Sequence, residues 1–157
     1  MMDEVSIRRA HVADADQISA VIAETLDVSN KPDYGAENIA SVTAHFTPGK
    51  VAELLVERCY LVAQLGGKII GAVNLKLTGL DSGVVSAFFV LPDQQGLGVG
   101  KKLLGALEVE ARARSANMVL SLHASIAGEK FYLSQGYIGH GDVWDGTQRT
   151  IRMTKTL

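Results

Sequence analysis

Residues 95–100 (Gln-Gly-Leu-Gly-Val-Gly) place three glycines at alternating positions between an apolar, strand-like run and an amphipathic, helix-like run. Each glycine in a helix costs about 0.5–1 kcal/mol relative to alanine, so something must require the bare backbone here. Backbone amides at a helix N-terminus are unpaired, and they bind anions together with the positive end of the helix dipole. The turn therefore predicts an anion site, with close packing of the helix against the strand as the alternative.

Two lysines, Lys101 and Lys102, follow this turn directly. Cations in the first turn of a helix oppose the dipole by roughly 0.3–1 kcal/mol each, and a bound anion would explain them. The spacing excludes two other phosphate-binding motifs. Lys101 and Leu103 stand where a dinucleotide fingerprint would need its third glycine, and a P-loop would need glycine in place of Gln95 and serine or threonine in place of Lys102.

A second motif lies downstream at residues 131–137 (Phe-Tyr-Leu-Ser-Gln-Gly-Tyr). The chain resembles the GCN5-related N-acetyltransferase (GNAT) superfamily at both places. The glycine turn matches the superfamily signature Gln/Arg-x-x-Gly-x-Gly/Ala, and the second motif matches Phe-Tyr-x-x-x-Gly-Phe/Tyr. Residues 7–16 and 151–155 are similar to its first and last elements, so the resemblance spans nearly the whole chain in the same order. It implies an N-acetyltransferase in which a primary amine attacks acetyl-CoA directly.

The resemblance also implies which residues hold acetyl-CoA. The amides of the glycine turn would bind the pyrophosphate, and the end of the preceding strand would pair its backbone with the pantetheine arm. That strand and the strand at 118–122 would diverge to leave a slot for the thioester. Many relatives carry asparagine where this chain has Ser125, which could bind pantetheine or cap a helix. The implied residues are Phe89, Val90, Leu91, Gln95, Gly96, Leu97, Gly98, Val99, Gly100, Lys101 and Ser125.

Tyr132 is the implied catalytic side chain, because a phenol can donate a proton to the thiolate that leaves the thioester. A thiol has a pKa near 8.5 and a phenol near 10, so the donation requires a site that favours it. Packing alone is the alternative role for Tyr132. The strand at 84–91 contains no acidic residue, so the base that deprotonates the amine stays open among Asp81, Glu37, His123 and a water on a backbone carbonyl.

The acceptor would enter opposite CoA, between the segment at 28–36 and the last hairpin. A free amine is cationic, and Asp33, Glu37 or Asp142 could hold it there until it loses its proton. The candidate acceptor-binding residues are Tyr34, Glu37, His123 and Trp144, each with plain surface or packing as its alternative role. Amino acids, polyamines, antibiotics, peptide N-termini and protein lysines all stay open as small-molecule or peptide acceptors.

Composition predicts one soluble domain over residues 1–157, with 47% hydrophobic and 20% charged residues. The net charge of −2 argues against a nucleic-acid partner, and no apolar run approaches the ~20 residues of a membrane span. The N-terminus lacks a signal-peptide pattern, so we expect a cytoplasmic protein. One cysteine excludes an internal disulfide, and no histidine has metal-ligand spacing, so no metal is expected. Dimers that form through strand edges are common among the relatives, so the resemblance leaves a homodimer as an open alternative.

Hydrophobic periodicity predicts an α/β fold of three layers, with a mixed, mostly antiparallel sheet of about six to seven strands flanked by helices. Strands are expected at 5–8, 59–64, 68–77, 84–91, 118–122, 137–144 and 149–156. One helix is expected to begin at residue 14, and further helices are expected at 36–44, 50–56, 103–111 and 127–135. Residues 28–35 read as a loop because they contain serine, asparagine, proline and glycine.

Two other functions compete with the enzyme. A non-catalytic acyl-CoA-binding regulatory module would retain the pocket without the chemistry; the missing carboxylate base favours it, and Tyr132 counts against it. If the chain is instead a generic nucleotide-phosphate binder, NAD or ATP would protect it against heat and CoA would not. Release of CoA in the presence of amines separates these alternatives.

Overall fold

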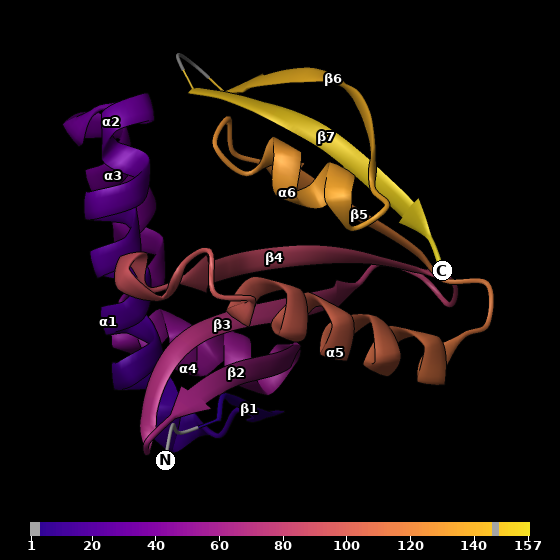
Figure 1. The fold of residues 1–157 in the computed structure, drawn as a ribbon, viewed down its shortest axis with the longest axis horizontal. Coiled ribbons are helices and arrows are strands. Elements are labelled where there is room, and N and C mark those ends of the chain that lie inside the picture. Colours follow the sequence, from indigo (N-terminus) through magenta and orange to yellow (C-terminus); the bar gives the residue numbers. More distant parts are fainter. Residues whose placement is uncertain (1–3, 146–147) are drawn as a thin grey trace.

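A computed structural model describes residues 4–145 and 148–157. A seven-stranded sheet runs through it in the order β1-β2-β3-β4-β5-β7-β6 (Figure 1). All neighbouring strands are antiparallel except β4 and β5, which are parallel. The mixed, mostly antiparallel sheet predicted from the sequence is therefore confirmed. The strands are β1 (Ser6–Arg9), β2 (Cys59–Leu65), β3 (Lys68–Leu77), β4 (Ser82–Val90), β5 (Val119–Ala124), β6 (Ile138–Asp145) and β7 (Gln148–Thr156).

Helices cover both faces of the first half of the sheet. In Figure 1, α5 passes in front of β2–β4 and α4 lies behind them, while α1 packs against β3, β4 and α4. Leu103, Leu104 and Leu107 recur at helical spacing on α5 and are fully buried against the sheet, so their periodicity determines which face of α5 is buried. The helices are α1 (Ala15–Thr25), α2 (Lys31–Tyr34), α3 (Ala36–Thr43), α4 (Pro48–Glu57), α5 (Val99–Arg114) and α6 (Glu129–Ser134). None of the described helices is both long and apolar enough to span a membrane.

The prediction that residues 28–35 form a loop is wrong. The chain continues from α1 into a π-helical turn, Leu26–Asn30, and then into α2, which ends at Gly35. Pro32 is compatible with this helix because it lies in the first turn, where a missing amide removes no helical hydrogen bond. Gly35 ends the helix with a φ of +82°, a conformation that favours glycine. The segment therefore presents ordered side chains, including Tyr34.

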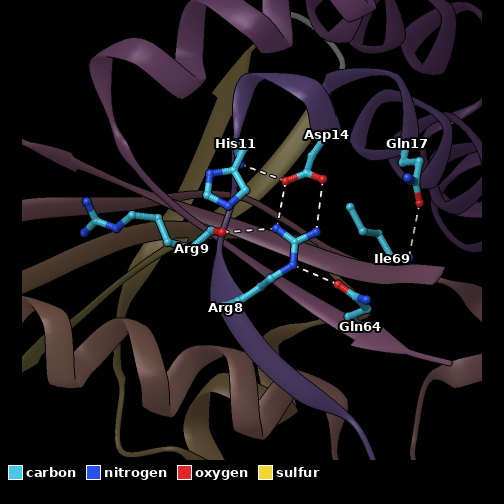
Figure 2. Close-up of polar contacts among 7 residues, drawn as sticks. All are labelled: Arg8, Arg9, His11, Asp14, Gln17, Gln64 and Ile69. Carbon is cyan, nitrogen blue, oxygen red and sulfur yellow. Dashed lines mark hydrogen bonds and ion pairs between the residues drawn. The ribbon is translucent and has the colours of Figure 1, made fainter. Parts of the chain in front are cut away.

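Arg8 joins β1 to the start of α1 (Figure 2). Its Nη1 and Nη2 donate to the two carboxylate oxygens of Asp14 at 2.8 and 3.0 Å, and its Nε donates to Gln64 on β2 at 2.8 Å. Asp14 also accepts from the backbone amide of His11 at 2.7 Å. The hydrogen bond from Arg8 holds the pKa of the buried Asp14 carboxyl below its usual value. This network fixes α1, whose far end reaches the cavity described below.

The hairpin predicted between the last two strands is formed by β6 and β7. The sequence Asp145-Gly146 between the two strands is typical of a tight hairpin turn, and Gly146 lies outside the described residues. β7 lies between β5 and β6, so the last strand of the chain is inside the sheet.

Candidate active site

The glycine turn leads directly into α5, and two of its glycines have a left-handed backbone. Gly96 has a φ of +78° and Gly98, the residue before α5, has a φ of +88°. A Cβ added to either would meet no atom within 4 Å, and a Cβ on Gly100 would lie 3.5 Å from the Phe131 ring, which is an ordinary contact. Close packing therefore requires none of the three glycines. Backbone conformation requires glycine at 96 and 98 and leaves Gly100 unexplained by the fold.

The first amides of α5 are available to a ligand. The Lys102 amide donates to the Gly98 carbonyl at 3.1 Å, so the amides of Val99, Gly100 and Lys101 precede the helix's own hydrogen-bond ladder. They lie at the positive end of the helix dipole, beside a cavity that Gly100 and Lys101 line. This arrangement suits a phosphate group.

The Gln95 side chain fixes the turn to the end of β4. Its amide nitrogen donates to the Val90 carbonyl at 2.9 Å and to the Ser29 hydroxyl at 3.1 Å. The Thr25 hydroxyl, whose shorter hydrogen bond goes to the Val21 carbonyl at 2.7 Å, lies 3.2 Å from the same Val90 carbonyl oxygen. Sequence reasoning assigned only the Gln95 backbone to the site and missed this clamp, because nothing in the sequence places Thr25 and Ser29 beside residue 90.

β4 and β5 separate after a short paired stretch. Their register runs only from Ser82 with Val119 to Val84 with Ser121. Farther along, β4 carries one residue more than β3, and Ala87 in this bulge has a φ of +49°. Bulges bend a strand and increase its twist. The expected slot between the two strands is therefore present.

The slot belongs to a cavity of about 910 Å³ beside the glycine turn. The cavity brings together Phe89, Val90, Gln95, Gly96, Gly98, Gly100, Lys101, Ser125, Tyr132, Tyr34 and His123 from the expected site residues. Five expected residues are not among its lining. Leu91 and Val99 are buried in the core, and Leu97, Glu37 and Trp144 are exposed. Residues that the sequence did not indicate, such as Asn30, Phe46, Gln148 and Thr150, complete the lining.

Tyr132 lies in an aromatic cluster on the wall of this cavity. Its ring makes edge contacts with Phe88, Phe131 and Tyr137 at centroid distances of 6.1, 5.3 and 5.8 Å. Its hydroxyl has no hydrogen-bond partner within residues 4–145 and 148–157. Burial raises the pKa of Tyr132, so the phenol keeps its proton at neutral pH.

Two hydrogen bonds shape the loop before α6. The Ser125 hydroxyl accepts from the Gly128 amide at 3.1 Å, and the Tyr34 hydroxyl accepts from the Ile126 amide at 2.9 Å. Ser125 thus caps the turn that leads into α6, one of the two roles left open by the sequence. Both residues also line the cavity.

The candidate bases lie in different places. His123 is exposed and lines the cavity from β5. The Asp81 carboxylate accepts a hydrogen bond from Ser115, outside the cavity lining, and Glu37 is exposed outside it. Asp142 pairs with Arg149 at 2.8 Å. Of the three side chains considered as bases, His123 is the one that reaches this cavity. The described residues form no group of three or more potential metal-ligating side chains.

Comparison with known proteins agrees with this geometry. The family model for the acetyltransferase (GNAT) domain matches residues 30–157. An aminoalkylphosphonate N-acetyltransferase from Salmonella typhimurium is 30% identical over 166 aligned positions, which cover 100% of this chain and 94% of the relative. A GCN5-related N-acetyltransferase from Rhodopseudomonas palustris has a TM-score of 0.83 and 28% identity, covering 100% of this chain and 98% of that one.

A further solved structure is similar in fold. The PaiA N-acetyltransferase from Thermoplasma acidophilum, in complex with coenzyme A, has a TM-score of 0.87 at 20% identity, with 98% of this chain and 99% of that chain covered. The family and the enzyme class expected from the two sequence motifs are thereby confirmed. The chain belongs to the GNAT family of N-acetyltransferases.

Proposed function

We propose that this enzyme moves an acetyl group from acetyl-CoA to a primary amine inside the cavity between the glycine turn and Tyr132. One observation carries the proposal: the two motifs lie 31 or more residues apart in the sequence, from Gly100 to Phe131, yet both line the same cavity. The turn supplies an anion site, and Tyr132 supplies a proton.

Acetyl-CoA fits the residues present. Its pyrophosphate would bind the amides of Val99, Gly100 and Lys101, where the helix dipole and the lysine charge both favour an anion. The pantetheine arm would lie in the slot between β4 and β5, beside Phe89. Two relatives of the same fold were solved with coenzyme A, the Thermoplasma acidophilum enzyme and an aminoglycoside 6'-N-acetyltransferase, which supports the same ligand here.

The chemistry is a direct acyl transfer. Acetyl-CoA supplies an activated thioester carbonyl. The neutral amine nitrogen attacks that carbon, a C–N bond forms, and the C–S bond breaks. Tyr132 donates its proton to the departing sulfur, and the proton lost by the amine passes to His123 or to water. Burial makes the Tyr132 phenol a weaker acid, but it also makes a thiolate leaving into the same cavity a stronger base, so the donation stays feasible. General acid–base assistance of this kind contributes roughly 10²–10⁴-fold in rate.

The acceptor we propose is a small primary amine that also carries an acidic group. Among the described residues that line the cavity, the charged or titratable nitrogen groups are Lys101 and His123, and no aspartate or glutamate is included. A polycationic acceptor would therefore be desolvated without a countercharge. The relative from Salmonella typhimurium is an aminoalkylphosphonate N-acetyltransferase, which points in the same direction.

A panel of amines tests both levels of the proposal. Release of CoA is measured with 2-aminoethylphosphonate, β-alanine, ethanolamine and cadaverine, which differ mainly in the group opposite the amine. Turnover of any amine supports acetyl transfer, and higher kcat/KM for the two acidic amines supports the acceptor class. Tight CoA binding with no turnover of any amine would instead support the non-catalytic acyl-CoA-binding module.

A further inference from the structure

A second cavity, of about 400 Å³, shares no lining residue with the cavity beside Tyr132. It lies where the end of β1, the junction of α4 with β2, the end of β3 and the C-terminus of α5 meet. Four of its lining side chains are cationic and one is acidic, although the whole chain has a net charge of −2. Its lining is Arg9, Val56, Glu57, Arg58, Cys59, Leu75, Lys76, Leu77 and Arg114.

Strand alternation explains how Arg9 reaches this cavity. Arg8 turns toward Asp14 at the start of α1, and Arg9, the next residue of β1, points the other way (Figure 2). On that side Arg9 meets Glu110 of α5 at 3.3 Å and the Cys59 sulfur at 3.4 Å. The Arg9 and Glu110 side chains are 56% and 40% exposed, so water weakens their attraction.

The positive charges of the other basic residues at this cavity are neutralised even less by neighbouring acidic groups. Within the described parts of the chain, Lys76 and Arg114 form no ion pair. Arg114 lies in the last turn of α5, where the helix dipole favours a cation, but that reason does not apply to Lys76 or Arg9. Glu57 offsets one of the four positive charges, and the like charges that remain repel each other unless an anion lies between them.

Arg58 is held in place by neutral acceptors. Its Nη1 donates to the Asn74 side-chain oxygen at 3.2 Å and to the Ser86 hydroxyl at 3.4 Å. Neither acceptor neutralises the guanidinium. An arginine has five N–H donors, and the Nε and Nη2 groups of Arg58 have no partner in the described structure. The register pairs Cys59 with Leu75 and Tyr60 with Asn74, so Asn74 faces the side of the sheet opposite Cys59. The Arg58 guanidinium therefore points away from Arg9, which contacts Cys59.

We propose that this second cavity binds a small polyanion with phosphate or carboxylate groups. Arg9 and Arg114 supply planar donors that match either group, and Lys76 adds a point charge. The two cavities share no lining residue, but Arg58 donates to the Ser86 hydroxyl, which lines the cavity beside Tyr132. The test therefore changes Lys76 and Arg114 and leaves Arg58 in place.

Isothermal titration of inorganic pyrophosphate and of citrate tests the site, in the presence of excess CoA so that the glycine turn is occupied. The test variant is Lys76→Gln with Arg114→Gln, two exposed positions where loss of the fold is not expected. The matched control is Lys68→Gln with Lys130→Gln, which removes the same charge from exposed positions outside both cavities. Thermal melts of both variants confirm that they are folded.

Saturable binding of either anion to the wild type is expected. The test variant should bind about a hundredfold more weakly, since each lost charged contact weakens binding about tenfold, and the control should bind like the wild type. The stronger of the two anions identifies the preferred group. Absence of saturable binding overturns the proposal, and so does an equal loss in both variants, which would mean that only net charge matters. If CoA itself fails to bind, the proposed function fails, and the comparison of the two variants still decides this site.

Discussion

The Tyr34 hydroxyl accepts a hydrogen bond of 2.9 Å from the backbone amide of Ile126, 92 residues farther along the chain. The bond joins the helical segment after α1 to the loop before α6, which are two walls of the cavity beside Tyr132. Burial is the main cause that raises the pKa of Tyr34, so its hydroxyl stays protonated and can also donate to a ligand.

Replacing Tyr34 by phenylalanine keeps the ring and removes this acceptor. One hydrogen bond contributes about 1 kcal/mol, so we expect KM for the acceptor amine to rise roughly fivefold with a small change in kcat. Steady-state kinetics at saturating acetyl-CoA measure the effect. Tyr60→Phe is the matched control, because Tyr60 is buried in the core outside the cavity lining. An unchanged KM in Tyr34→Phe would mean that the bond does not shape the acceptor site.

The glycine turn offers a matched pair of substitutions. Gly98→Ala forces alanine into a left-handed conformation and should cost about 1–2 kcal/mol, a fall in Tm of roughly 2–8 °C. Gly100→Ala meets only ordinary contacts and should leave Tm nearly unchanged. We nevertheless expect Gly100→Ala to weaken acetyl-CoA binding, because a methyl group there obstructs the approach of the pyrophosphate. Thermal melts and isothermal titration separate the two effects. Wild-type affinity in Gly100→Ala would contradict the placement of the anion.

Tyr132 should act as a general acid over the whole neutral and mildly alkaline range. A general acid works in its protonated form, which is present below its pKa and lost as pH rises through it. Burial raises the pKa of Tyr132 above its ordinary value of 10.0, so no fall in kcat from this group is expected below about pH 10.

The substitution Tyr132→Phe should lower kcat by about 10²–10⁴-fold and leave the affinity for acetyl-CoA unchanged. Measurement of kcat against pH in the wild type, Tyr132→Phe and the Tyr60→Phe control checks this. A fall in wild-type kcat centred well below pH 10 that disappears in Tyr132→Phe would contradict the raised pKa.

Asp14 should make stability depend on pH in the acid range. Its pKa is lowered in the folded protein, chiefly by the hydrogen bond from Arg8. The stabilisation is therefore fully present above the unfolded-state pKa of about 3.9, and it is lost as pH falls through the lower folded-state pKa.

We expect Asp14→Asn to cost about 2 kcal/mol at pH 7, a fall in Tm of roughly 4–8 °C, and to approach the wild type in acid. Glu24→Gln, on the exposed side of α1, is the control and should change little. Urea melts between pH 7 and pH 3 provide the comparison. A difference between wild type and Asp14→Asn that stays constant over this range would contradict the role of the carboxylate charge.

The two motifs could be predicted from the sequence because each is local. Gly96 and Gly98 have the positive φ that a turn into a helix requires, and the period of Leu103, Leu104 and Leu107 defines the buried face of α5. Patterns of this kind depend on neighbours within one element, so they can be read without knowing the fold.

Contacts between distant segments could not be predicted in this way. Thr25 and Gln95 meet at the Val90 carbonyl only because α1 packs beside β4. Trp144 was a plausible acceptor-binding residue by its type, but it is 63% exposed and outside the cavity lining. Residues 28–35 resembled a loop by composition, yet Pro32 fits the first turn of a helix. Tertiary packing decides each of these cases.

Transfer of a labelled acetyl group tests the central claim most directly. Carbon-13-labelled acetyl-CoA is mixed with 2-aminoethylphosphonate and the protein, and the products are followed by NMR and by mass spectrometry of the intact chain. Direct attack predicts that the label appears on the amine nitrogen, that the protein gains none, and that Tyr132→Phe slows the transfer strongly. Label that stays on CoA for every amine in the panel, or that accumulates on the protein, would contradict acetyl transfer by direct attack in this cavity.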